Sequence, residues 1–564
     1  MKLFPPLSAL LMIGSCLPLT TLSQSANAPL NDDYYHLIDR YEIRSGQLTP
    51  HLHTSWKAYP REFIAQFADS IDTRITLSGR DRFNLRYLRN DNWEWSNREE
   101  NASKRPILKS FYKVQSDLFH VSTKDFDLHV SPVLHLSAGR ESAEDVNTFI
   151  NTRGVELRGM IDKKVGFYSF LGENQLVNPL YVRQRRASNL TVPHEGFWKG
   201  YEENGVDFFT ARGYISFNAT RHINFQFGHD RFAVGNGHRS LILSDFSPAY
   251  LFLKINTKVW KFNYTNLFTE MTADISGNAS GLTGSSRYPD KYMALHHLSL
   301  NIGKKLNIGV FEAVIFSNED SVSGNRFELK YLNPVIFYRA IEQQNGSPDN
   351  VLLGTDFKWL AAKRISIYGQ IVFDEFLLDN LREGDGWWAN KWAFQIGGEY
   401  VDAFGLENLD LQGELNVSRP YTYTHDTPFG SYSNYRQPLA HPLGANFREW
   451  VGILRYQPLD RLNLTARLIY ANYGTDTTDS NWGSNILLQN TSREMDFGNE
   501  IGQGVDSDLV YGDFTISWQW KHNFFIDLKH IYRRLDSALP ELDEETNFTS
   551  LVLRWNIPQR LHEF

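Results

Sequence analysis

The sequence has 564 residues, a formal net charge of −8 and 14% aromatic residues. Single soluble cores rarely grow past about 250–300 residues, so a soluble chain of this length should divide into domains. No Pro-, Ser- or Gly-rich linker separates two parts, and the hydrophobic fraction of 41% is what half-polar strands would produce. The mild acidity argues against a nucleic-acid partner.

Residues 1–28 are predicted to be a signal peptide. Lys2 is its basic end, the stretch 7–22 is mostly apolar, and Ala26-Asn27-Ala28 has the pattern of a cleavage site. Pro29 is a poor first mature residue, so cleavage after Ser25 is an alternative. Beyond this segment no apolar run approaches the ~20 residues of a membrane helix, so a membrane location would require a barrel.

The only cysteine, Cys16, lies inside the signal segment. Ile13-Gly14-Ser15-Cys16 has a passable lipoprotein-type pattern, and lipidation of Cys16 is an alternative to a plain signal residue. In both cases the mature chain can hold no internal disulfide.

Residues 29–105 are predicted to form a small helical subdomain, periplasmic or plugging the barrel mouth. Pro60 to Ile71 should be a helix with proline in its first turn, and Asp81 to Leu88 a second short helix. Tyr34 to Ile43 is a short mixed segment. A soluble cap without any gating role is the alternative.

Residues 106–564 are predicted to form an outer-membrane β-barrel. In the hairpin Asp508 to Arg534, Phe514, Ile516 and Trp518 alternate with Asp513, Thr515 and Ser517. Strand side chains point to opposite faces with period two, so one face is oily and the other is charged. An apolar face ending in aromatics, opposite a face carrying Asp, Lys and Arg, is typical of a barrel with lipid outside and a polar lumen.

The connections alternate in length, as they do in outer-membrane barrels. This spacing predicts about 18 antiparallel strands of ~10 residues. Short turns are expected at 162–164, Asn256-Thr257, 303–305, 362–364, 404–405, 458–460 and 521–523. Long loops are expected at 173–205, 231–248, 273–290, 318–349, 375–390, 419–444, 474–507 and 535–546.

The last strand is predicted to run from Phe548 to Trp555. Phe564, an aromatic residue at the end of the sequence, resembles the signal read by the barrel assembly machinery. Pro558 interrupts this pattern, and the alternative is a strand that ends at Asn556 and leaves a short tail.

Two long segments, 229–250 and 331–350, are too patterned for floppy loops and are expected to narrow the lumen. Arginine offers a planar fork to carboxylates or phosphates, and amides pair with hydroxyls, so their polar residues suggest a sugar-chain site. The alternative is a salt-bridge network that plugs the barrel. The candidates are Arg231, His238, Arg239, Asp245, Arg339, Glu342 and Gln343.

Aromatic residues in the long loops are the second indication of a carbohydrate ligand. Polysaccharide could stack on them, although each could equally belong to the interfacial aromatic girdle. The candidates are Trp387, Trp388, Tyr421 and Tyr423.

Enzyme signatures are absent from the sequence: there is no G-x-S-x-G elbow, no H-E-x-x-H and no P-loop. The 17 histidines show no tight metal-ligand spacing. No catalytic residue, cofactor or metal is therefore expected.

Three blocks, Tyr35 to Gly46, Leu241 to Phe268 and Tyr331 to Gly354, resemble the capsule-assembly Wzi-like outer-membrane family, and more narrowly its Bacteroidetes members of the gliding-motility RemB type. The resemblance implies an 18-stranded barrel with helical elements and a lectin-like role in holding capsular polysaccharide. It transfers no sugar-contact residue.

The leading hypothesis is a non-enzymatic outer-membrane barrel that binds, assembles or attaches surface polysaccharide. A component of gliding or adhesion machinery, bound through residues 29–105 to a periplasmic or motility-machinery protein, is the first alternative. A diffusion porin is the second.

Overall fold

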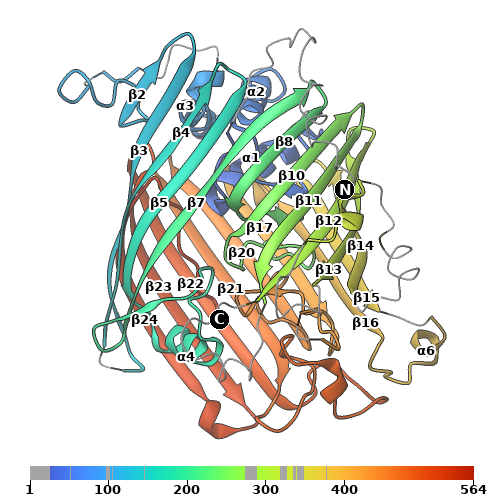
Figure 1. Cartoon of the computed structure of the whole chain (residues 1–564). Coiled ribbons are helices and arrows are strands. Elements are labelled where there is room, and N and C mark those ends of the chain that lie inside the picture. The colour runs from blue at the N-terminus through green and yellow to red at the C-terminus, as the bar shows by residue number, and fades with distance from the viewer. Residues whose placement is uncertain are drawn as a thin grey trace, which may run out of the picture.

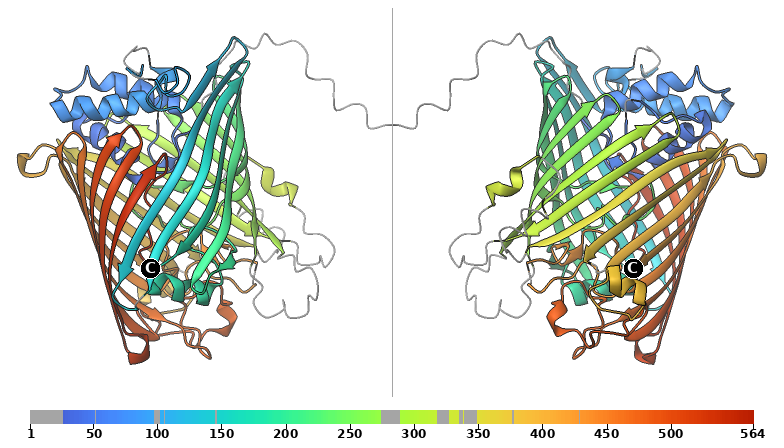
Figure 2. Two further views of the ribbon diagram at one scale, coloured as in Figure 1. Left: turned by 90° about the vertical axis from the view of Figure 1, so that its left-hand side faces the viewer. Right: turned by 90° about the vertical axis from the view of Figure 1, so that its right-hand side faces the viewer.

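The computed structural model describes residues 26–50, 52–96, 102–104, 106–144, 146–273, 289–317, 327–334, 338, 349–375, 378–427 and 429–564. These residues form a closed barrel of 18 antiparallel strands (Figures 1 and 2), which confirms the predicted fold class. Most of the predicted signal peptide, including Cys16, lies outside the described residues.

The barrel strands are β3 (Phe126–Glu141), β4 (Asn147–Ile161), β5 (Val165–Val177), β7 (Gly205–Thr220), β8 (Ile223–Asp230), β10 (Tyr250–Val259), β11 (Phe262–Thr272), β12 (Asp290–Ile302), β13 (Leu306–Phe316), β14 (Asn350–Ala362), β15 (Ile365–Glu375), β16 (Lys391–Tyr400), β17 (Leu409–Ser418), β20 (Phe447–Leu459), β21 (Leu462–Thr475), β22 (Val505–Lys521), β23 (Phe524–Ser537) and β24 (Glu544–Trp555). Short strands are β1 (Trp56–Lys57), β2 (Phe119–Ser122), β6 (Lys199–Tyr201), β9 (Ala233–Val234), β18 (Ser433–Asn434) and β19 (Gln437–Pro438). The helices are α1 (Asp32–Ser45), α2 (Arg61–Ile71), α3 (Gly79–Asp91), η1 (Trp93–Trp95), α4 (Leu180–Asn189), η4 (Leu329–Leu332), α6 (Leu378–Glu383), η5 (Ala403–Gly405), η6 (Asn490–Ser492) and η7 (Pro540–Leu542).

The last barrel strand closes the cylinder against the first. β24 pairs with β3 from Phe548 opposite Glu141 to Trp555 opposite Leu134. Where β24 ends, the short strand β2 continues the pairing with β3, with Phe119 opposite Val130. Because each barrel strand has a neighbour on both sides, the closed sheet leaves no open edge.

The β22–β23 hairpin has the alternation that the sequence predicts. Phe514, Trp518 and Leu528 are 45%, 41% and 48% exposed on the outside, whereas Asp513 and Asp527 are buried on the inside. An apolar outer surface is stable only against lipid, so this alternation gives the barrel its membrane-facing band.

Aromatic side chains gather where the outer surface meets the short turns. Trp260 is 73% exposed, Phe404 is 77% exposed and Trp520 is 53% exposed. Amphipathic rings favour the level of the lipid headgroups, so these residues form an aromatic girdle. No helix among the described residues is both long and apolar enough to cross a membrane.

The connections alternate strictly between two ends of the barrel, which we call the short-turn end and the long-loop end. Turns of a few residues join β4 to β5, β12 to β13, β14 to β15 and β22 to β23, as expected. The turn predicted at Asn256-Thr257 is wrong: both residues lie inside β10, and the chain turns at Trp260-Lys261. β10 continues past Thr257 because its pairing with β11 extends as far as Val259, which lies opposite Phe262.

A segment of helices α1, α2, α3 and η1 lies at the short-turn end (Figure 2). α2 and α3 fall where the sequence predicts helices, and Ile64, Phe67 and Leu88 are buried between them. The helix α1 was not predicted. One face of α1 packs Tyr35 and Ile38 into this helical core, and its charged residues face the barrel wall. Because charged residues are buried as well, the sequence lacks the separate polar face by which an amphipathic helix is recognised.

Buried ion pairs fix α1 to the barrel. Lys358 Nζ on β14 lies 2.6 Å from Asp39 Oδ1 and 2.8 Å from Glu42 Oε2. Arg40 on the same helix forms ion pairs with Asp402 in the β16–β17 connection and with Asp410 at the start of β17. The helix is therefore held by buried ion pairs.

The helical segment also hydrogen-bonds to the turns at this end. Leu48 N donates to Lys304 O at 2.7 Å. Asn84 Nδ2 donates to Gln457 Oε1 at 2.8 Å, and Tyr87 Oη donates to Asn523 Oδ1 at 2.5 Å. Two of these partners lie on turns and Gln457 lies at the end of β20, so the segment covers the end of the barrel.

Residues 556–564 fold back inside the barrel after β24. Tyr181 Oη donates to His562 O at 2.6 Å, and Phe564 is only 8% exposed. The last strand ends at Trp555, as predicted, and the residues after it form the short tail that Pro558 suggested, with Phe564 in the tail and not in a strand. This inward tail contributes to the functional site.

Candidate functional site

Two long loops and the C-terminal tail fill the middle of the barrel. Tyr423 Oη in the β17–β20 loop donates to Leu241 O in the β8–β10 loop at 2.7 Å, and Tyr432 Oη donates to Ile242 O at 2.7 Å. Leu241 and Leu243 are fully buried in an apolar cluster with β-strand residues. The two loops thus bring a small hydrophobic core into the lumen.

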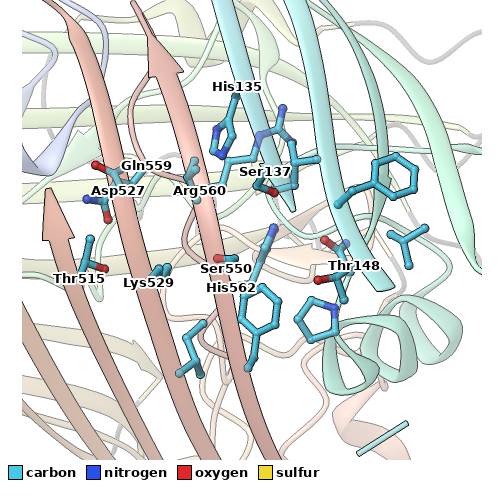
Figure 3. Close-up of a pocket in the computed structure, with 18 of the residues that line it drawn as sticks. His135, Ser137, Thr148, Thr515, Asp527, Lys529, Ser550, Gln559, Arg560 and His562 are labelled. Carbon is cyan, nitrogen blue, oxygen red and sulfur yellow. The ribbon is translucent and has the colours of Figure 1, made fainter. Parts of the chain in front are cut away.

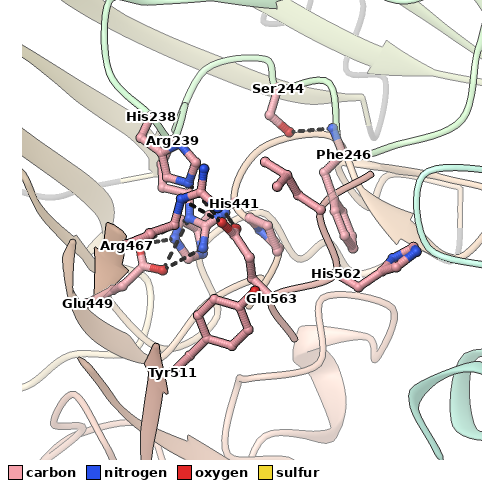
Figure 4. A network of polar contacts seen from close by, with 12 residues as sticks. His238, Arg239, Ser244, Phe246, His441, Glu449, Arg467, Tyr511, His562 and Glu563 are labelled. Carbon is pink, nitrogen blue, oxygen red and sulfur yellow. Dashed lines mark hydrogen bonds and ion pairs between the residues drawn. The ribbon is translucent and has the colours of Figure 1, made fainter. Parts of the chain in front are cut away.

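Arg239 is the centre of a polar network beside this core (Figure 4). Its Nη2 lies 2.9 Å from Glu449 Oε1 on β20, and its Nη1 pairs with Glu563 in the tail. The ring of Phe564 lies 4.9 Å from its guanidinium carbon. One arginine therefore joins a loop, the barrel wall and the tail.

Histidines and a second arginine complete the network. His441 Nε2 lies 2.7 Å from Glu449 Oε2, and His238 Nε2 lies 3.1 Å from Glu563 Oε1. Arg467 Nε on β21 lies 3.3 Å from the same Glu563 oxygen. Backbone N–H groups of His238 and Arg239 donate to Glu414 at 2.8 and 3.0 Å.

The charges in this network are set by their partners. Burial alone would raise the pKa of the Glu563 carboxyl, but Arg239 and His238 hold that pKa well below its usual range. Burial alone would lower the pKa of His238, but Glu563 and Asp32 raise it. The tail is therefore locked in place by an ionised carboxylate.

The cavities that remain around the tail are small. The pocket in Figure 3 has a volume of about 60 Å³ and lies between the tail and β3, β4, β23 and β24. A pocket of about 100 Å³ lies between α1 and β20 to β22. Ligand pockets usually measure about 300–1,000 Å³, so these spaces suit waters and not a sugar chain.

A much larger cavity opens at the long-loop end, and we call it the vestibule. Its volume is about 1090 Å³. Its walls are α4, the segments 436–444, 473–488 and 541–544, and β23, and Phe564 contributes to its lining. A cavity of this size can hold several sugar rings.

The vestibule is lined by apolar, neutral polar and charged groups, and the charged ones include five carboxylates, from Asp476, Asp479, Glu541, Asp543 and Glu544. Three arginines contribute to it: Arg185, Arg436 and Arg533. Amides and hydroxyls come from Gln184, Ser188, Asn189, Thr475, Thr477, Thr478 and Asn485. Such amides and hydroxyls suit neutral sugars, and arginine suits uronate or phosphate groups.

Arg533 shows how these cations are held. Its Nη1 lies 3.3 Å from Glu544 Oε2, and its guanidinium carbon lies 4.7 Å from the ring centre of Tyr181. Its Nε has no hydrogen-bond partner among the described residues. The group is therefore oriented while part of its hydrogen-bonding capacity remains unused.

The predicted polar candidates of the first loop come together inside the barrel. His238, Arg239 and Asp245 border one cavity of about 40 Å³ near the tail. Arg231 Nη1 donates to His194 O at 3.0 Å. His238 and Arg239 take part in the buried ion-pair network, which agrees with the alternative interpretation of a plug, whereas Arg231 contacts a backbone carbonyl. The other three polar candidates, Arg339, Glu342 and Gln343, lie outside the described residues.

The predicted aromatic candidates divide into two groups. Tyr421 and Tyr423 are 0% and 1% exposed, so their rings pack the interior and offer no face to a saccharide. Trp387 and Trp388 are half-buried, and the Arg493 guanidinium carbon lies 4.2 Å from the ring centre of Trp388. They lie beside the segment 493–499, outside the vestibule lining.

Sequence reasoning did not single out the vestibule residues. The basic run Arg183-Gln184-Arg185-Arg186 and the acidic run 541–545 are visible in the sequence. Their juxtaposition depends on the barrel closing β24 against β3, which places loops from opposite halves of the chain side by side.

Comparisons with known proteins agree on the architecture. No family model and no curated protein sequence matches the chain. A solved structure of Wzi, an outer membrane protein involved in group 1 capsule assembly in Escherichia coli and described as a carbohydrate-binding β-barrel, is similar with a TM-score of 0.56 and 13% identity. The match covers 95% of this chain and 100% of Wzi. At this identity the likeness shows the fold alone.

Porin structures are also similar, at a lower level. Pseudomonas aeruginosa OccK8 (OprE) has a TM-score of 0.42 and 11% identity over 76% of this chain and 97% of its own. Pseudomonas aeruginosa OprD has a TM-score of 0.40 and 10% identity over 76% of this chain and 94% of its own.

Proposed function

We propose that this chain is a non-enzymatic outer-membrane protein that binds surface polysaccharide in the vestibule and helps to attach or assemble it. The observation that carries the proposal is a roomy polar cavity at the long-loop end above a lumen filled by loops and the tail. On this proposal the long loops face the cell exterior and the helical segment faces the periplasm, after export through the signal peptide.

Two further observations favour a sugar polymer as the ligand. The vestibule combines neutral hydrogen-bonding groups with three arginines set among five carboxylates, which suits a chain carrying many hydroxyls and a few acidic groups. The similarity to Wzi, whose structure is described as carbohydrate binding, points in the same direction. A role in gliding or adhesion, with membership of the RemB type, remains an alternative through a partner of the helical segment.

Replacing Arg533 with alanine is expected to weaken binding of an acidic capsular polysaccharide by roughly ten- to a hundredfold, the value of one hydrogen bond to a charged group. The neighbouring Arg534 lies on the outer face of the same strand and is half-exposed, so Arg534→Ala is the matched control. Affinity is measured by titrating the full-length protein in detergent against acidic and neutral polysaccharides.

Equal affinities of the two variants and the parent protein would contradict vestibule binding. Recovery of a periplasmic or motility protein with the full-length chain, together with no polysaccharide binding, would favour the gliding alternative. A heat-modifiable band on gels confirms that each variant is a folded barrel.

The parent protein is expected to conduct poorly in planar bilayers. An empty barrel of 16–18 strands would leave an aqueous channel, but here loops, helices and the tail occupy the lumen. Single-channel recording measures this directly. Steady conductance comparable to that of an open porin would favour the diffusion-porin alternative.

A further inference from the structure

We propose that His120, Asp127 and His129 form a binding site for a Zn²⁺-type transition-metal ion at the short-turn end of the barrel. The site is separate from the vestibule. Among the described residues, their ligand atoms all lie within 4.8 Å of one another. Two imidazoles and one carboxylate suit zinc and its neighbours, and they suit Mg²⁺ or Ca²⁺ poorly.

The β2–β3 hairpin puts the three side chains on one face. His120 lies directly opposite His129, and Ser122 lies directly opposite Asp127. Cross-strand partners have close Cβ atoms, and residues two apart on a strand share a face. The sequence alone does not reveal this group because β2 is only Phe119–Ser122, too short for a recognisable alternation.

The donor atoms already converge. His129 Nε2 lies 2.5 Å from Asp127 Oδ1, and His120 Nε2 lies 3.5 Å from Asp127 Oδ2. Apart from this long contact with Asp127, His120 Nε2 is buried without a hydrogen-bond partner among the described residues. Zinc–nitrogen bonds measure about 2.0–2.1 Å, so tetrahedral donors lie roughly 3.3 Å apart, and modest side-chain rotations would make room for the ion.

A second carboxylate orients His129. Its Nδ1 lies 2.8 Å from Asp117 Oδ2 and can keep its proton there, while Nε2, which now donates to Asp127, would release its proton when it binds the ion. Trp93 Nε1 donates to the same Asp117 oxygen at 2.7 Å, and Arg158 Nη2 lies 3.3 Å from its other oxygen. Histidines that bind metals usually donate their other ring N–H to a carboxylate held in this way.

The position of the site gives the ion a structural role. Trp93 belongs to η1, at the end of the helical segment, and its ring centre lies 4.6 Å from that of His120 and 5.5 Å from that of His129. The ion would fix the hairpin against which η1 packs, and so would steady the helical segment at the barrel wall. The three protein donors leave one tetrahedral position for water.

The test is Co²⁺ titration of the metal-stripped, full-length protein without a histidine tag, followed by visible d–d absorption and by competition with Zn²⁺. One tetrahedral Co²⁺ per chain is expected, with loss of this spectrum in His120→Ala and Asp127→Ala. Asp117→Asn keeps all three donors and is expected to weaken binding by about 10–100-fold.

The control is His222→Ala, which removes a histidine from the β7–β8 turn at the same end and should leave Co²⁺ binding unchanged. No tetrahedral Co²⁺ spectrum in the parent protein would overturn the proposal and leave only a histidine–carboxylate ion-pair cluster. An unchanged spectrum in both His120→Ala and Asp117→Asn would overturn it as well, and Asp117→Asn keeps the test valid if a ligand variant fails to fold.

Discussion

Replacing Arg239 with methionine is expected to lower the free energy of unfolding by about 3–5 kcal/mol, the usual effect of removing one partner of a buried ion pair. Methionine fills much of the space but removes the cation that Glu449 and Glu563 share, so Glu449 keeps His441, and Glu563 keeps His238 and Arg467. Both carboxylates are buried, since Glu449 is fully buried and Glu563 is 6% exposed. The tail should be held less firmly as a result.

Urea unfolding in phospholipid vesicles, followed by tryptophan fluorescence, measures this change. The triple variant Arg239→Met, Glu449→Gln, Glu563→Gln neutralises three linked charges and should recover part of the lost stability, since neutral replacement of a buried ion pair is often tolerated. The recovery is partial because Arg467 loses its contact with Glu563. The exposed pair of Arg534 with Asp536 gives the control, because Arg534→Met should have no measurable effect. A small effect of Arg239→Met alone would show that water reaches the network.

Replacing Lys358 with methionine is expected to weaken the attachment of the helical segment by about 3–5 kcal/mol, again because buried carboxylates lose their cation. Lys358 is 1% exposed, and it is the ammonium group 2.6 Å from Asp39 and 2.8 Å from Glu42. The barrel itself should stay closed, because its strand pairing does not depend on α1. The helices should therefore become sensitive to protease before the barrel does.

Limited proteolysis of the folded protein, with mass spectrometry of the products, measures cleavage within residues 26–96. Lys363→Met changes an exposed lysine in the turn of the same β14–β15 hairpin and should leave the cleavage rate unchanged. The triple variant Lys358→Met, Asp39→Asn, Glu42→Gln should restore much of the protection. Equal cleavage of Lys358→Met and Lys363→Met would show that other contacts hold the segment.

The barrel could be predicted from the sequence because lipid imposes a simple period on each strand. Phe514, Trp518 and Leu528 point outward for the same reason in any such barrel, whatever the lumen contains. The turn error at Asn256-Thr257 arose because polar residues inside β10 resemble a turn. The two-residue alternation of side chains therefore predicts where strands lie better than it predicts where they end.

The interior could not be predicted, because it depends on contacts between distant segments. Tyr421 and Tyr423 were expected at loop tips as possible sugar platforms, but the loop folds inward and buries both rings. Their hydroxyls donate to Asn481 O and Leu241 O, which are 60 and 182 residues away in the sequence. No local pattern carries that information, and the same holds for α1, whose charges make sense only beside Lys358.

The attachment of the helical segment to several turns has a mechanical consequence. A thin-walled tube resists stretching along its length, but it flattens easily into an ellipse when it is squeezed from the side. Leu48, Asn84 and Tyr87 form hydrogen bonds to the turn after β12, the end of β20 and the turn after β22. The helical segment therefore connects separate points on the rim of the barrel. Together with the close-packed interior, these connections should keep the cross-section of the barrel round under lateral membrane pressure.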